Sequence, residues 1–336
     1  MKRLVICADG TWNAPESEGA KDNSSTNVLK MLRAILPKDQ NDVEQIRYYC
    51  QGVGTGNAVD TLTGGMFGAG LSNHVLECYR FLANNYCVGD EIYIFGFSRG
   101  AFTARSLGGL IGALGLVTPS QLGKLPDGWA YYRLPPEKRA TIEGQALLKY
   151  LDQRVTSVPI RCIGVWDTVG SLGVPGRFFN MYRASEFEFH DCKLGANVKV
   201  ALHALAIDEQ RKDFSPTEWD ENAVRAGQTM EQVWFPGVHA NVGGGYPDQG
   251  LSDVSLTWMI ERVSTHTKLE FSKDFIETHV VPDPTSTLYD SRRGIIWNLR
   301  PKYVRPIKQG ASIHQSVHKR CAAPLQPAYK PENLPA

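Results

Sequence analysis

Two kinds of apolar run alternate along this chain. Short runs rich in β-branched and aromatic residues predict buried strands at residues 3–8, 46–50, 92–95, 159–166 and 232–238. Between them, apolar residues recur every three or four positions, which predicts helices at residues 28–36, 71–84, 101–107 and 251–258. This alternation predicts an α/β fold with a mostly parallel sheet and helices on both faces. In such a fold the ligand site lies beyond the carboxyl ends of the strands.

Other segments depart from the alternation. Residues 52–70 are rich in glycine and are interpreted as a rim beside a pocket, because neither glycine cluster completes a phosphate-binding motif. Residues 118–156 are polar and punctuated by proline, which suits a lid-like insertion, and residues from about 324 onward suit a polar surface tail. Residues 198–207 fit a strand or a helix, and we favour a helix. We expect residues 1–336 to form a single domain.

Composition narrows the function classes. The chain has 336 residues, a net charge of +1 and 42% hydrophobic residues, so no global field favours nucleic acid as a partner. The seven cysteines are scattered without a C-x-x-C pair, which argues against a disulfide framework or a zinc site, and we expect neither metal nor cofactor. The first apolar run is too short for a signal peptide, and no run is long enough to span a membrane. The default location is the cytoplasm, and the oligomeric state stays open.

The candidate chemistry begins at Gly96-Phe97-Ser98-Arg99-Gly100, which has the spacing G-x-S-x-G. The motif follows a predicted strand and precedes a predicted helix, the context in which such a serine is held on a sharp turn with its oxygen exposed. An ordinary strand-to-helix turn with a capping serine is the alternative. We interpret Ser98 as a nucleophile in an α/β-hydrolase-like fold.

A serine nucleophile needs a histidine base and a carboxylate that orients the histidine. His239 is the best base, because it follows a predicted strand and precedes a glycine run, and His314 is a distant second. Asp167 follows the predicted strand 159–166 and is our choice of acid. Asp208 is its rival, and the choice would reverse if residues 198–207 formed a strand.

The oxyanion formed by attack on a carbonyl needs two N–H donors. Arg99 would supply the first, and the loop with Gly10 and Thr11 the second. Asp9, Trp12 and Trp166 are expected to line the substrate pocket. The run Asp9-Gly10-Thr11 is also similar to the aspartyl-phosphate motif of phosphatases, but that motif needs a second aspartate where this chain has Cys7.

Five ordered blocks carry a resemblance, namely Cys7-Ala8-Asp9-Gly10-Thr11-Trp12-Asn13, Gly52-Val53-Gly54-Thr55-Gly56, Gly96-Phe97-Ser98-Arg99-Gly100-Ala101, Val165-Trp166-Asp167-Thr168-Val169-Gly170 and Pro236-Gly237-Val238-His239. Together they resemble the catalytic domain of type VI secretion phospholipase effectors of the first type, over residues 4–333. The resemblance implies an α/β-hydrolase with Ser98 as nucleophile and, in secreted members, cleavage of phospholipid acyl esters. Two features depart from the family: Asn241 stands where an aspartate is usual, and the long extra region of toxin members is missing.

The sequence therefore predicts a serine ester hydrolase, lipase-like or phospholipase-like, acting on a small-molecule or lipid ester, with type VI secretion as a possible route of export. One alternative is a catalytically silent member of the fold that binds a lipid or partner protein. The other is a metal-dependent phosphatase built on Asp9.

Overall fold

A computed structural model describes the chain except for residues 11–23, 53–63, 170–191, 294–296, 298–299 and 336. Its centre is a seven-stranded sheet in the order β2-β1-β3-β6-β7-β8-β9, in which every neighbouring pair is parallel. The strands are β1 (Arg3–Ala8), β2 (Gln45–Cys50), β3 (Glu91–Phe97), β6 (Ile160–Trp166), β7 (Val198–Ala206), β8 (Thr229–Phe235) and β9 (Ser312–Ile313). The predicted α/β fold with a mostly parallel central sheet is confirmed.

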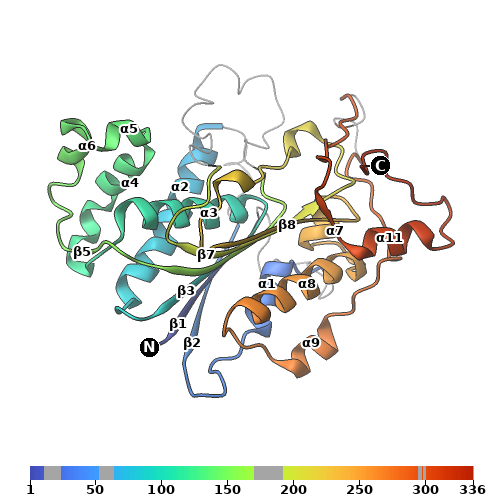
Figure 1. Cartoon of the computed structure of the whole chain (residues 1–336), viewed down its shortest axis with the longest axis horizontal. Coiled ribbons are helices and arrows are strands. Elements are labelled where there is room, and N and C mark those ends of the chain that lie inside the picture. Colours follow the sequence, from blue (N-terminus) through green and yellow to red (C-terminus); the bar gives the residue numbers. More distant parts are fainter. Residues whose placement is uncertain (11–23, 53–63, 170–191, 294–296, 298–299, 336) are drawn as a thin grey trace.

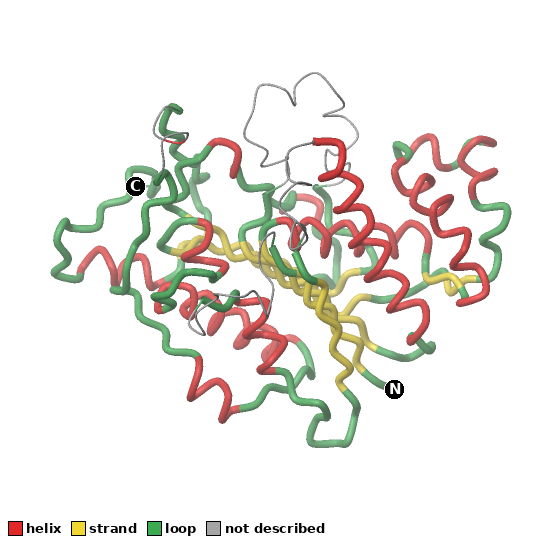
Figure 2. Tube along the Cα trace, turned by 180° about the vertical axis from the view of Figure 1, so that it is seen from behind, coloured by secondary structure: helices red, strands yellow, loops and turns green. Residues whose placement is uncertain are grey.

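Helices cover both faces of the sheet, as the alternation predicted (Figures 1 and 2). On one face lie α2 (Gly64–Asn85) and α3 (Arg99–Leu114), and on the other lie α1 (Asn27–Ala34) and α8 (Gly250–His266). Alternate residues of β1 serve the two faces, since Leu4 and Ile6 belong to the first cluster of buried side chains and Val5 to the second.

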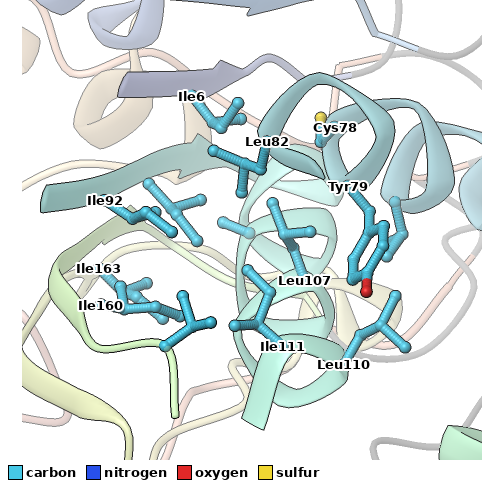
Figure 3. Packing of buried hydrophobic residues seen from close by; sticks show 14 of the residues in the cluster. Ile6, Cys78, Tyr79, Leu82, Ile92, Leu107, Leu110, Ile111, Ile160 and Ile163 are labelled. Carbon is cyan, nitrogen blue, oxygen red and sulfur yellow. The ribbon is translucent and has the colours of Figure 1, made fainter. Parts of the chain in front are cut away.

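The first cluster shows why α2 and α3 sit where they do (Figure 3). Leu82 of α2 and Leu107 of α3 meet Ile92 of β3 there, and all three side chains are fully buried. Burying a side chain of this size stabilises the fold by about 1.5 to 3 kcal/mol. Because α3 is fixed by this packing along its length, the turn that precedes it is fixed as well.

The segment 198–207 forms strand β7, so the favoured helix is wrong. Its residues are buried on both sides because β7 lies inside the sheet between β6 and β8. The glycine-rich stretch 52–70 is also corrected in part, because its end from Gly64 onward is about the first two turns of α2.

The insertion is helical and is closed by a small antiparallel sheet. It comprises β4 (Leu116–Val117), η2 (Pro119–Lys124), α4 (Leu125–Arg133), α5 (Pro136–Arg139), α6 (Ile142–Leu147) and β5 (Arg154–Val155). Its Tyr132 lies against Gly109, and its Gly128 against Leu114, near the end of α3. At 1.5 Å per residue, Gly109 lies about 16 Å and Leu114 about 24 Å along the helix from Ser98. These contacts place this part of the insertion away from Ser98, and its role as a lid stays a prediction.

The C-terminal part contains further short elements, namely η5 (Lys212–Phe214), η6 (Glu221–Ala223), α7 (His239–Gly243), α9 (Lys273–His279) and α11 (Gln315–Ala322). The segment from about 324, expected to be a polar surface tail, lies largely at the surface and is anchored to the domain at particular residues. Tyr329 is buried and donates to Asp208 at 2.8 Å, and Asn333 donates to the carbonyl oxygens of Ile207 and Arg305. Residues that follow β7 therefore anchor the end of the chain.

Candidate active site

Ser98 occupies the sharp turn between β3 and α3. Its φ of 58° and ψ of −118° are unusual for a residue with a side chain, and its own N–H donates to the carbonyl oxygen of Trp166 at 3.1 Å. Its carbonyl oxygen accepts the N–H of Phe102 and so begins the helix. This is the strained strand-to-helix conformation that the G-x-S-x-G motif requires.

The two glycines of the motif are needed because backbone atoms crowd both positions. A Cβ at Gly96 would lie 2.3 Å from the carbonyl oxygen of Gly100, and a Cβ at Gly100 would lie 2.0 Å from that of Ala8. Real Cβ atoms do not approach backbone oxygens so closely. The glycines thus let the start of α3 lie directly against the end of β1.

Asp167 and His239 form a buried pair at the same edge of the sheet. Asp167 follows β6, whose last residue Trp166 is in register with Phe97 of β3, so Asp167 and Ser98 leave neighbouring strands side by side. His239 is the first residue of α7, and its Nδ1 lies 2.5 Å from Oδ2 of Asp167. An Nδ1 proton held by the carboxylate leaves Nε2 as the basic nitrogen.

His239 also lies beside the serine turn. Its ring stacks at a tilt against Phe97, with 4.6 Å between ring centroids, and meets the edge of Phe214 at 4.9 Å. Because Phe97 is the neighbour of Ser98 in the chain, these contacts bring the imidazole to the turn that carries the hydroxyl. The structure therefore gathers the three sequence-predicted residues at one rim of the sheet.

Arg305 completes the surroundings of Asp167, and sequence reasoning missed it. Its Nη1 donates to Oδ1 of Asp167 at 2.7 Å and its Nη2 to Oδ2 at 3.0 Å. The same guanidinium donates to the carbonyl oxygens of Ala206 and Phe214, and the side chain is fully buried. Arg305 lies in an irregular segment between α9 and β9, where no periodic pattern or motif marks it.

A second buried carboxylate, Glu209, holds the backbone at His239. It accepts the N–H of His239 at 3.2 Å and two side-chain N–H bonds from Arg211, at 2.8 and 2.9 Å. The guanidinium of Arg211 lies 3.6 Å above the ring of Phe214, which in turn contacts the imidazole. Glu209 and Arg211 are thus a paired, positioning unit that sequence analysis also missed.

Burial and pairing set the charges of the pair. Burial alone would raise the pKa of Asp167, but Arg305 and His239 hold it well below its ordinary value, so the carboxylate is charged. Burial lowers the pKa of His239 below 6.5, and Asp167 opposes this shift only in part. At neutral pH the imidazole is therefore uncharged and able to accept a proton.

The rival acid Asp208 has different partners. Its Oδ2 accepts the N–H of Gly237 at 2.6 Å and the phenol of Tyr329 at 2.8 Å, and burial raises its pKa. The segment before it is a strand, the condition under which we would have preferred it, yet the carboxylate that contacts His239 is that of Asp167. His314, the second candidate base, caps α11 and contacts Ser316 instead.

Of the residues predicted for the oxyanion site and the pocket, the structure describes some and leaves others out. Arg99 is the first residue of α3, at the helix start next to Ser98. The N–H of Gly10, however, donates to Oδ1 of Asp9 at 2.7 Å, so in this conformation it is not offered to a substrate. Thr11 and Trp12 lie outside the described residues.

Asp9 and Trp166, two further predicted pocket residues, both have buried side chains. The carboxylate of Asp9 is buried and also accepts from Thr26 Oγ1 at 2.6 Å and from the Tyr49 phenol at 2.7 Å, so it orders the end of β1. Trp166 is fully buried in the second core cluster, where it packs with residues of α1 and α8. Whether either side chain contacts a substrate stays a prediction.

Comparison with known proteins decides the family. The model of a family described as "T6SS, Phospholipase effector Tle1-like, catalytic domain" matches residues 2–262. The chain belongs to this family. The resemblance seen in the sequence motifs is thereby confirmed, and Arg305 lies beyond the part of the chain that the Tle1-like model covers.

Three individual proteins are similar to this Tle1-like chain, at sequence identities of 30% or less. An uncharacterized protein of Saccharomyces cerevisiae, YEL023C, is 30% identical over 234 residues, which is 63% of this chain and 32% of the yeast protein. An uncharacterized protein from Pseudomonas aeruginosa has a crystal structure with a TM-score of 0.49 at 19% identity, covering 84% of this chain and 49% of the other. A structure of the Tle1 effector bound to the VgrG spike has a TM-score of 0.38 at 22% identity, covering 73% of this chain and 51% of that chain. The chain thus spans about a third to a half of the length of these proteins.

Asn241, where the sequence resemblance led us to expect an aspartate, is buried and uses both ends of its amide. Its Nδ2 donates to the carbonyl oxygen of Thr287 at 3.0 Å, and its Oδ1 accepts the N–H of Tyr289 at 3.2 Å. A carboxylate could not donate to Thr287. In this chain these two hydrogen bonds connect α7 to the segment that follows α9.

Proposed function

We propose that this protein is a serine hydrolase that cleaves carboxylic esters of lipids through an acyl-enzyme on Ser98. The observation that carries the proposal is the strained Ser98 turn beside the buried Asp167–His239 pair. Membership of a family of phospholipase effectors favours a phospholipid as substrate. The family's name also supports export through type VI secretion as part of the proposal. Among the described residues, the helices are all too short or too polar to cross a membrane.

In the proposed reaction, Nε2 of His239 takes the proton of Ser98 as its oxygen attacks the ester carbonyl carbon. The resulting oxyanion is stabilised by the N–H of Arg99, at the positive end of the α3 dipole. Collapse of the tetrahedral intermediate expels the alcohol, which receives the proton from His239. Water then repeats the sequence on the acyl-enzyme and releases the acid. Asp167 stabilises the imidazolium in both halves.

The contacts of Asp9 disfavour the phosphatase alternative. Three donors, from Gly10, Thr26 and Tyr49, already surround its buried carboxylate, whereas an aspartyl-phosphate enzyme needs a carboxylate that is open to an incoming phosphate. A binding protein without catalysis remains the second candidate, and it is distinguished by experiment.

The test is covalent labelling by a fluorophosphonate, followed by hydrolysis of phospholipid vesicles. We expect about one probe per chain on the wild type and none on Ser98→Ala, because the hydroxyl is the group that forms the bond. Ser106→Ala is the matched control, since Ser106 lies in the same helix about two turns further on. Labelling that persists in Ser98→Ala, or a wild type that neither labels nor releases fatty acid, would refute the proposal.

A further inference from the structure

A cluster of metal-binding side chains lies outside the active site, between the end of β2 and the face of α2. Sγ of Cys50, a ring nitrogen of His74 and a carboxylate oxygen of Glu77 lie within 4.8 Å of one another. Cys78 lies one position after Glu77, and both it and His74 lower the pKa of the Cys50 thiol. A thiol, an imidazole and a carboxylate thus face one point, with the thiol of Cys78 beside that of Cys50.

Helix geometry explains how α2 supplies three of the four groups. His74, Glu77 and Cys78 are spaced i, i+3 and i+4, so they share one face of the helix. Cys50 is the last residue of β2 and approaches that face from the sheet. The first core cluster, which contains the buried Cys50 and Cys78, supports the inner side (Figure 3 labels Cys78).

The outer side of the cluster is open. His74 is half-buried and Glu77 is exposed, so an ion can enter from solvent. The phenol of Tyr48 donates to one carboxylate oxygen of Glu77, which leaves the other oxygen to act as a ligand. Buried thiols, an imidazole and an oriented carboxylate together are typical of a protein zinc site.

We propose that Cys50, His74, Glu77 and Cys78 bind one zinc ion that fastens β2 to α2. Thiolate and imidazole ligands favour Zn²⁺ over Mg²⁺ or Ca²⁺, and four donors satisfy its tetrahedral preference. With Zn–S near 2.3 Å and Zn–N near 2.0 Å, tetrahedral ligand atoms lie about 3.3 to 3.8 Å apart. For Cys50, His74 and Glu77, whose ligand atoms lie within 4.8 Å of one another, changes of about 1 to 1.5 Å in these separations would reach that geometry. On binding, the thiols and the imidazole release to solvent the protons that occupy their ligand atoms.

The protonation of the cluster is compatible with this role. Interactions with Cys78 and His74 lower the pKa of the Cys50 thiol despite its burial. The four ligands come from positions 50, 74, 77 and 78, without any pair of cysteines at motif spacing. The sequence predicts no zinc site because the cysteines are scattered. The fold brings Cys50 to the other ligands, which the spacing along the chain does not show.

The test measures zinc directly. The full chain is stripped with a chelator, transferred to metal-free buffer, and titrated with Zn²⁺ against a chromophoric competitor. We expect about one zinc per chain, a rise in melting temperature on loading, and thiolate-to-metal charge-transfer absorption when Co²⁺ replaces Zn²⁺. His74→Ala should weaken zinc binding by about tenfold or more, and Cys50→Ser should abolish the charge-transfer band or reduce it by about half.

Cys87→Ser is the matched control, because Cys87 is an exposed cysteine just beyond the end of the same helix. If Cys50→Ser does not fold, His74→Ala decides the question, since His74 is only half-buried. Less than about 0.2 zinc per chain, or equal affinities for His74→Ala and Cys87→Ser, would overturn the proposal. A disulfide between Cys50 and Cys78 in protein that takes up no zinc would also overturn it. Because metal content is measured without substrate, this test is independent of the proposed ester hydrolysis.

Discussion

Replacing Arg305 by methionine tests whether this residue holds the catalytic carboxylate. The substitution keeps the apolar stem and removes a guanidinium that makes four hydrogen bonds, two of them to Asp167. Breaking a buried ion pair costs about 3 to 5 kcal/mol, because it leaves an uncompensated charge in the interior. Asp167 keeps two donors, the N–H of Ala206 and Nδ1 of His239, and it can also take up a proton. Because these interactions remain, we expect Arg305→Met to lose about 3 to 5 kcal/mol of unfolding free energy and not more.

The same substitution should change how stability depends on pH. In the wild type the pKa of Asp167 is lowered, so its contribution to stability is present above the unfolded pKa of about 3.9 and is lost as the pH falls through the folded value. In Arg305→Met, burial dominates and raises this pKa, so ionisation at higher pH destabilises the variant. The stability difference between the two proteins should thus be largest near pH 8 and shrink toward about pH 4.

The assay is urea unfolding of wild type and Arg305→Met at several pH values, together with the rate of fluorophosphonate labelling. Labelling should slow by up to about 10⁴-fold, the loss seen when a triad aspartate can no longer fix the histidine tautomer. Arg262→Met is the control, because Arg262 forms a partly exposed pair with Glu231 and should cost at most about 1 kcal/mol. A loss below about 1 kcal/mol for Arg305→Met, or one of equal size at pH 5 and pH 8, would refute the reasoning.

Other predictions concern the turn, the base and the departure from the family. Gly100→Ala should lower the melting temperature sharply or abolish folding, whereas Gly123→Ala, whose Cβ meets nothing within 4 Å, should change it little; equal melting temperatures would contradict the packing argument. The rate of fluorophosphonate labelling should be constant at neutral and alkaline pH and fall on acidification with a midpoint below 6.5, since the pKa of His239 is lowered; a midpoint above 7 would be inconsistent with a buried base. Asn241→Asp should lose about 1 to 3 kcal/mol in chemical unfolding because the carbonyl oxygen of Thr287 loses its donor, and unchanged stability would show that this bond is dispensable.

The residues at the ends of strands were those that the sequence could identify. Ser98, Asp167 and His239 each follow an apolar run closely, and parallel strands deliver such residues to one edge of the sheet. The order of apolar and amphipathic segments was likewise enough for the fold class, because it reflects which faces must be buried.

Residues placed by tertiary structure alone could not be identified. Arg305 and Glu209 come from irregular segments whose sequence carries no periodicity, and their importance appears only when the buried groups around them are known. The segment 198–207 was misassigned for a related reason. A strand buried on both faces is apolar at almost every position, and this pattern does not distinguish it from a buried helix.

The distance along the chain between Asp167 and its guanidinium partner has a consequence for biosynthesis. The two residues are separated by 138 positions, and the cation emerges from the ribosome after all seven residues that form β8. A nascent chain that ends at residue 262, where the family match ends, contains the carboxylate of Asp167 but not the guanidinium of Arg305. Because chains fold from the N-terminus as they are made, the Asp167–Arg305 ion pair must form late, when the last seventy or so residues join a sheet that is already complete but for β9.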